Sequence, residues 1–82
     1  MDKRIGVIGI VIEDTSQAGE VNRLLHEYSH IIIGRMGIPY KERGLNLISV
    51  MVDGTNDDIG ALSGKLGKIK GLSVKSALSK KH

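Results

Sequence analysis

The arrangement of this chain is decided by residues 24–40, which read LLHEYSHIIIGRMGIPY. Apolar residues at helical spacing end at Tyr28, and the β-branched run 31–33 follows almost at once. A helix therefore passes into a strand with almost no linker, because a repeat of 3.6 residues gives way to residues that favour extended backbone. We predict this strand at residues 31 to about 38 and expect Pro39, which lacks a backbone donor, to end it on a sheet edge.

Two elements precede this junction. The run RIGVIGIVIE at residues 4–13 is too short and too rich in Ile and Val for a helix, so it predicts a first strand. Thr15 or Ser16 is expected to cap the helix that continues to Tyr28 or Ser29. The apolar residues of that helix fall on a single stripe, which consists of Ala18, Val21, Leu24, Leu25 and Tyr28.

A second helix is predicted after Thr55, which should cap it. Gly71 fits the C-terminal cap of this helix. The charges follow the order that the helix dipole favours, with Asp57 and Asp58 in the first turn and Lys68 and Lys70 in the last turn.

A polar loop at residues 40–44, a third strand at 45–53 and a fourth at 72–78 complete the order βαββαβ. This order predicts an α+β, ferredoxin-like fold, in which a four-stranded antiparallel sheet has both helices on one face and the strand order 4-1-3-2. The length of 82 residues makes residues 1–82 a single domain with a small core. The central strands one and three are apolar on both sides, so one sheet face lacks a cover. We expect a second copy to supply it, in a dimer or a tetramer.

The composition excludes several classes of protein. Cysteine is absent, which excludes disulfides, thiolate catalysis and any iron–sulfur or zinc site built on sulfur from this chain. Neither a signal peptide nor an apolar run of membrane length is present, so we expect a cytoplasmic protein that does not enter a membrane. A net charge of only +3 and two tyrosines as the only aromatic residues argue against direct nucleic-acid binding.

Catalysis is not expected either, because the chain shows no acid–base pair and no nucleophile elbow. The glycines of the stretch GVIG at residues 6–9 lie inside a strand and form no phosphate loop at a strand-to-helix turn.

The histidines His26 and His30 sit at the helix–strand junction. On one continuous helix they would be i and i+4 on a single face, a spacing that can chelate a transition metal. The run at 31–33 argues that the helix stops first, and His26 lies away from the apolar stripe. The fold resembles the metal-sensing domain of the nickel-responsive regulator, which binds its metal between subunits. Two interpretations remain open: a metal site completed by a neighbouring subunit, or two ordinary surface histidines.

The turn at residues 13–21 resembles the ACT-domain turn that holds an amino acid at a subunit interface. An acidic residue, Asp14, and the glycine Gly19 open the first helix, and Asn22 follows on the same side. Arg35 on the second strand supplies a group that can meet a carboxylate or a phosphate. We predict these four residues as ligand-binding. The alternatives are a capped turn and an arginine that protects an edge strand from aggregation.

Three glycines of the second helix line up on a side away from its apolar stripe: Gly60, Gly64 and Gly67. Each costs about 0.5 to 1 kcal/mol relative to alanine in a helix. Close approach of another backbone or a ligand would offset this cost, so we predict an interface there. The alternative is a surface helix that tolerates glycine because its core stripe holds it.

The stretch 24–40, followed by LNLISVMVDG and by GALSGKLGKIKGLSVKSAL, resembles the family of iron-only hydrogenase system regulators, which are ACT-like proteins. The resemblance covers nearly all of the chain. It implies a regulatory module that assembles, senses a small ligand or a metal, and passes its state to a protein of the hydrogenase system. The alternative is a structural adaptor that binds a hydrogenase maturation partner and no small molecule.

Overall fold

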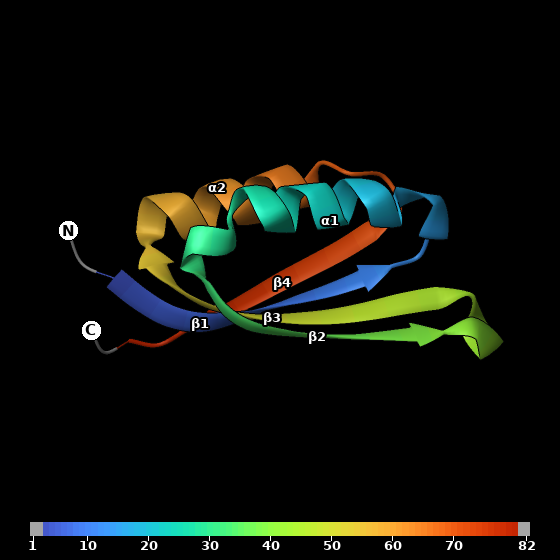
Figure 1. Cartoon of the computed structure of the whole chain (residues 1–82), viewed down its shortest axis with the longest axis horizontal. Helices are drawn as coiled ribbons and strands as arrows, with labels where there is room; N and C mark the ends of the chain where they lie inside the picture. Colours follow the sequence, from blue (N-terminus) through green and yellow to red (C-terminus); the bar gives the residue numbers. More distant parts are fainter. Residues whose placement is uncertain (1–2, 81–82) are drawn as a thin grey trace.

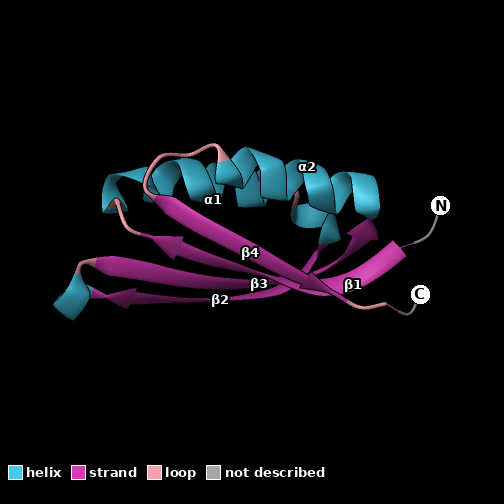
Figure 2. Ribbon diagram, turned by 180° about the vertical axis from the view of Figure 1, so that it is seen from behind, coloured by secondary structure: helices cyan, strands magenta, loops and turns pink. Residues whose placement is uncertain are grey.

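The computed structural model describes residues 3–80, which form two layers (Figure 1). Two helices lie over one face of a four-stranded sheet, and the other face has no layer on it (Figure 2). Three short 3-10 turns, η1 to η3, connect the elements. The elements in chain order are β1 (Lys3–Ile12), η1 (Thr15–Gln17), α1 (Ala18–Glu27), η2 (Ser29–Ile31), β2 (Ile32–Tyr40), η3 (Lys41–Arg43), β3 (Leu45–Thr55), α2 (Asn56–Gly67) and β4 (Leu72–Leu78).

The sheet has the order β2-β3-β1-β4, and every neighbouring pair is antiparallel. This confirms the predicted ferredoxin-like arrangement, in which strands one and three are central. The residues of β1 alternate strictly between the two faces, because successive side chains of a strand point to opposite sides.

The core lies between the sheet and the helices. Even-numbered residues of β1 and β3 line its sheet side, and one apolar stripe of each helix lines its helix side. Of the stripe predicted for the first helix, Val21, Leu24 and Leu25 are buried, and Ala18 and Tyr28 are half-buried. The largest fully buried side chains are Ile8, Ile10, Ile12, Val21, Leu25, Val50, Val52, Leu62 and Leu66.

The predicted cap of the second helix is confirmed and that of the first is wrong. Thr55 Oγ1 accepts a hydrogen bond from the Asp58 N–H at 3.1 Å. Before α1, however, Asp14 rather than Thr15 or Ser16 is the capping residue, and it caps η1. Helix α1 then begins directly from η1, and its N-cap residue Gln17 makes no side-chain capping bond.

The end of α2 also differs from the prediction. The helix stops at Gly67, so Lys68 and Lys70 lie beyond it and Lys65 is the basic residue of its last turn. Gly71 is not its cap. With φ at 81°, Gly71 instead forms the turn into β4, and its carbonyl accepts the backbone N–H groups of Glu13 and Asp14.

Pro39 does not end β2, which continues to Tyr40. Proline is tolerated there because β2 is an edge strand, as predicted. The irregularity of this strand lies earlier: Ile32 pairs with Val52 and Gly34 pairs with Met51, so Ile33 is an extra residue in a β-bulge.

Candidate functional site

The bulge at Ile33 decides which side chains of β2 face the helices. Beyond it, Arg35 pairs with the buried Val50 and so stands on the helix side, whereas Met36 pairs with Ser49 on the open side. Strict alternation from the inward-facing Ile32 would have placed Met36 inward and Arg35 outward. One inserted residue therefore directs a guanidinium group toward α1.

Arg35 reaches across to the first helix. Its Nη2 donates a hydrogen bond to Asn22 Oδ1 at 2.7 Å, and both side chains remain exposed. These two predicted ligand residues, which are 13 positions apart in sequence, thus meet at one point.

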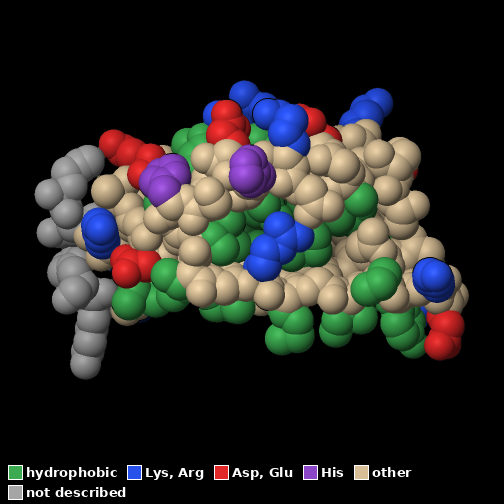
Figure 3. All heavy atoms as spheres, viewed as in Figure 1, with side chains coloured by type: hydrophobic (Ala, Val, Ile, Leu, Met, Phe, Trp, Pro, Cys, Tyr) green, Lys and Arg blue, Asp and Glu red, His purple; other side chains and the backbone are tan. Residues whose placement is uncertain are grey.

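A hollow of about 260 Å³ opens beside this pair, between the first turns of α1 and the outer half of β2. It exists because Gly37 and Pro39 are the next inward-facing residues of β2 and neither fills the space beneath the helix. Figure 3 shows hydrophobic side chains at the bottom of a hollow in this side of the molecule, with a basic side chain across it. Its walls are both apolar and polar, and include Ile12, Ala18, Asn22, Arg35, Pro39 and Asn46.

The hollow has unpaired positive charge. Within residues 3–80, Arg35 forms no ion pair, and its bond to Asn22 occupies one of its five N–H donors. The acid Glu20 of α1 is bound by Arg23, with its carboxylate oxygens 2.9 Å from Nε and 2.7 Å from Nη2. That pair lowers the pKa of Glu20 and raises the pKa of Arg23. The Arg35 guanidinium is therefore free to bind an anion.

Asp14 and Gly19 lie on the same end of the molecule but do not line the hollow. Asp14 Oδ1 accepts hydrogen bonds from the Ser16 hydroxyl at 2.7 Å and the Ser16 N–H at 3.1 Å, and these bonds lower the pKa of the Asp14 carboxyl. Gly19 is exposed on α1, and a Cβ placed there would meet nothing within 4 Å. The capped turn therefore accounts for Asp14, and the ligand role of both residues stays a prediction.

The sequence indicated that His26 and His30 are not on one helix, and in the structure they are on separate elements. His26 is exposed on α1, and His30 lies on the separate turn η2. The His30 ring stacks on Tyr28 with centroids 6.2 Å apart, and its Nε2 is 3.5 Å from Asp58 Oδ2. Residues 3–80 contain no group of three or more histidine or carboxylate ligands. A metal at these histidines would need ligands from another chain, and the predicted site remains a prediction.

The glycine row of α2 faces open space. A Cβ placed on Gly60, Gly64 or Gly67 would meet nothing within 4 Å. The fold itself therefore does not require glycine at these positions, and their role in an interface remains a prediction.

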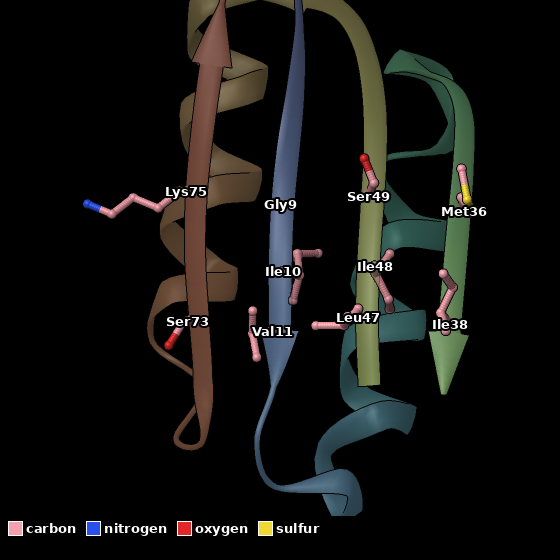
Figure 4. A pocket seen from close by; sticks show the side chains of 10 residues that line it. All are labelled: Gly9, Ile10, Val11, Met36, Ile38, Leu47, Ile48, Ser49, Ser73 and Lys75. Carbon is pink, nitrogen blue, oxygen red and sulfur yellow. The ribbon is translucent and has the colours of Figure 1, made fainter. Parts of the chain in front are cut away.

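The open face of the sheet, which we call the outer face, is apolar across three strands. Its large exposed side chains come from β1, β2 and β3, and they project along the lower edge of Figure 3, whereas charges gather on the helices. A shallow hollow of about 370 Å³ lies near its middle, beside Gly9 and Ser49 (Figure 4). The large exposed apolar side chains that form this part of the outer face are Ile5, Val7, Met36, Ile38, Tyr40 and Leu47.

A family described as "TM1266-like: Iron-only hydrogenase system regulator, putative" matches residues 4–76 of the chain. The chain belongs to this family. The structure of protein TM1266 from Thermotoga maritima, a protein described as uncharacterized, is 44% identical and has a TM-score of 0.90. The match covers 96% of this chain and 100% of that one. Among curated proteins, none matches the chain.

The hydrogenase-regulator family shares its fold with more distant proteins. CPII from Thiomonas intermedia K12, a PII-like nitrogen regulatory protein bound to ADP, AMP and bicarbonate, has a TM-score of 0.53 at 12% identity, covering 96% of this chain and 99% of that one. The divalent ion tolerance protein CutA1 from Ehrlichia chaffeensis has a TM-score of 0.51 at 12% identity, covering 100% of this chain and 87% of that one. At these identities the likeness concerns the fold alone.

Within residues 3–80, no helix is long and apolar enough to span a bilayer.

Proposed function

We propose that this member of the family regulates a hydrogenase system as a sensor of a small anionic ligand, which binds in the hollow beside Arg35 and Asn22. The carrying observation is a guanidinium oriented by a 2.7 Å hydrogen bond, without an acidic partner in the described chain, at the mouth of a partly apolar hollow. A guanidinium in this state pairs well with a carboxylate or a phosphate. The volume of about 260 Å³ suits a small metabolite with a short apolar part.

The position of the hollow suggests how binding is passed on. A ligand there touches α1 on one side and β2 on the other, because Asn22 and Arg35 come from these two elements. The next residue of β2, Met36, stands on the outer face. Bound ligand would stabilise one placement of β2 against α1 and so bias the surface that β2 presents to a partner.

Ligand-dependent thermal shifts test this proposal. A panel of short aliphatic carboxylates and inorganic phosphate should contain a compound that raises the melting temperature, since a ligand at 100 times its Kd stabilises by about 2.7 kcal/mol. Arg35→Gln should remove the shift. Arg23→Gln is the matched control, because Arg23 is already paired with Glu20 and lies outside the hollow. An adaptor that binds no small molecule would show no shift with any compound, and an equal shift in Arg35→Gln would exclude this site.

A transition metal is the second candidate ligand, favoured by the approach of His30 Nε2 to Asp58 Oδ2 at 3.5 Å. We expect His26 or His30 to hold it together with groups of a neighbouring subunit, and acidification below about pH 6 to release it. Stoichiometric uptake of nickel, cobalt, zinc or copper, lost in a His26→Ala/His30→Ala variant, would support this site. Equal uptake by the double variant would place the metal elsewhere.

A further inference from the structure

The outer face is large enough to form a stable interface. Its six exposed apolar side chains are 39% to 60% accessible. At roughly 200 Å² for a fully exposed large residue, they leave on the order of 600 Å² per protomer, close to the roughly 800 Å² per partner of a standard interface. This area lies at the upper end of the roughly 300–600 Å² that the largest apolar patch of a typical monomer exposes.

The apolar surface is centred on β3. The outer face of β4, beyond β1, carries Ser73, Lys75 and Ala77, so β2, β3 and β1 alone form the apolar part. Strand β3 is the middle one of these three. A polar strand beside an apolar centre matches the usual rim of a protein interface.

Large and small residues alternate across β3 in a complementary way. In the row through Ser49, β2 presents the 60% exposed Met36 and β1 presents Gly9. In the next row the sizes are reversed, because β2 presents Gly34 and β1 presents Val7 on either side of Met51. Figure 4 shows Met36, Ser49 and Gly9 across one level of the sheet.

The fold does not require glycine at position 9. A Cβ there would meet only the Lys75 carbonyl oxygen, at 3.8 Å, which is ordinary van der Waals contact. Glycine inside a central strand weakens the strand and often marks the close approach of another group. At Gly6, in contrast, a Cβ would collide with Leu78 and with the Ala77 carbonyl, so the packing of β4 explains that glycine.

From this pattern we propose that two copies pack their outer faces together about a two-fold axis along β3, with Met36 of each copy in the hollow beside Gly9 of the other. Such an axis places β2 of one copy over β1 of its partner. It then puts Met36 over Gly9 and Val7 over Gly34, while Ser49 and Met51 meet their own counterparts. Facing sheets cross at about 30°, so the match is closest in the row of Ser49, where the hollow lies.

The test uses Gly9→Val in the full chain, followed by sedimentation velocity and native mass spectrometry at micromolar concentrations. Valine should fold well in a strand, but it fills the hollow, so the dimer Kd should rise by about tenfold or more. Ser76→Val is the control. It also places valine in a strand, but Ser76 pairs with the buried Ile8 and so lies on the helix side of β4, away from the outer face, so dimerisation should not change.

Pairing of Met36 with Gly9 is tested by a double variant. If the two side chains meet across the axis, Met36→Ala should relieve the crowding, and Gly9→Val/Met36→Ala should dimerise more tightly than Gly9→Val alone. Additive losses would overturn this pairing. If Gly9→Val does not fold, Met36→Glu serves instead, since this exposed side chain can be charged without disturbing the core; a persistent dimer would then overturn the proposal.

Three further results would overturn the sheet-face dimer. One is a monomeric native protein at micromolar concentration. Another is a Gly9→Val variant that dimerises as tightly as the native chain. The third is a monomer that carries a small apolar molecule in the native mass spectrum, because the hollow would then be a ligand site. None of these measurements needs an anionic ligand, so failure here is distinct from failure of the Arg35 proposal.

Discussion

Val7 and Ile8 are neighbours on β1, and both are β-branched and apolar, but their environments are opposite. Ile8 is fully buried beneath the helices, whereas Val7 is 42% exposed on the outer face. The same contrast runs along β3, where Ile48 is buried and Leu47 is exposed. An apolar side chain in a strand therefore does not reveal whether the chain itself covers it; the number of layers decides that.

The largest difference in folding stability is expected between the variants Ile8→Glu and Val7→Glu. A carboxylate at position 8 would be buried without a partner, and we expect it to cost more than about 4 kcal/mol and to prevent folding. A carboxylate at position 7 should leave a folded monomer, within about 1 kcal/mol of the native monomer, that no longer dimerises. Urea unfolding followed by circular dichroism, together with sedimentation, measures both effects. Loss of folding in Val7→Glu would show that the outer face belongs to the core of one chain.

Leucine truncations give a smaller version of the same contrast. Leu62 on α2 is fully buried, so Leu62→Ala should lose about 2 to 5 kcal/mol of unfolding free energy. Leu47 is 39% exposed, and Leu47→Ala should cost the monomer less than about 1 kcal/mol. Both values are best measured in the Met36→Glu background, where dimerisation does not contribute. Equal losses at the two sites would contradict the assignment of Leu47 to an open surface.

The glycine row of α2 allows a test of whether the helix layer, like the sheet layer, carries an interface. Since a Cβ at Gly64 meets nothing, Gly64→Ala should stabilise the monomer by roughly 0.5 to 1 kcal/mol. We nevertheless predict that it weakens assembly or ligand binding, through a second interface on α2, and that Gly60→Ala does so more mildly. Melting temperature and sedimentation are measured together. A raised melting temperature with unchanged assembly and ligand response would show that the row is only tolerated.

The smallest effect on stability is expected from Asp14, which is exposed. Its hydrogen bonds from the Ser16 side chain and backbone lower the pKa of its carboxyl below the ordinary value of 3.8. The charged form is thus favoured in the folded state, so this contribution to stability is present above pH 3.8 and is lost as pH falls through the lowered pKa. Carboxyl titration by NMR should show the lowered pKa, and Ser16→Ala should move it back toward 3.8. An unchanged pKa in Ser16→Ala would exclude this cause.

The sequence was enough to predict which residues form much of the site, but not how they are placed relative to one another. Asn22 and Arg35 were recognisable as polar groups near one helix start and one edge strand, and the structure brings them into contact. The histidine separation was also predictable, because the β-branched run after His30 opposes a helix. The bulge at Ile33 was not predictable, since it follows from how β2 pairs with β3 and not from the residues of β2 themselves.

Local periodicity and turn chemistry are enough to predict the order of elements, the ferredoxin-like class and the apolar nature of both central strands. They do not show which apolar face is covered, which side of β2 carries Arg35, or where α1 and α2 begin and end. Each of these depends on contacts between distant parts of the chain: the helices bury only the even-numbered face of β1, and the register of β2 changes at one residue. Local preferences cannot encode such contacts, because a single inserted residue reverses every side chain that follows it.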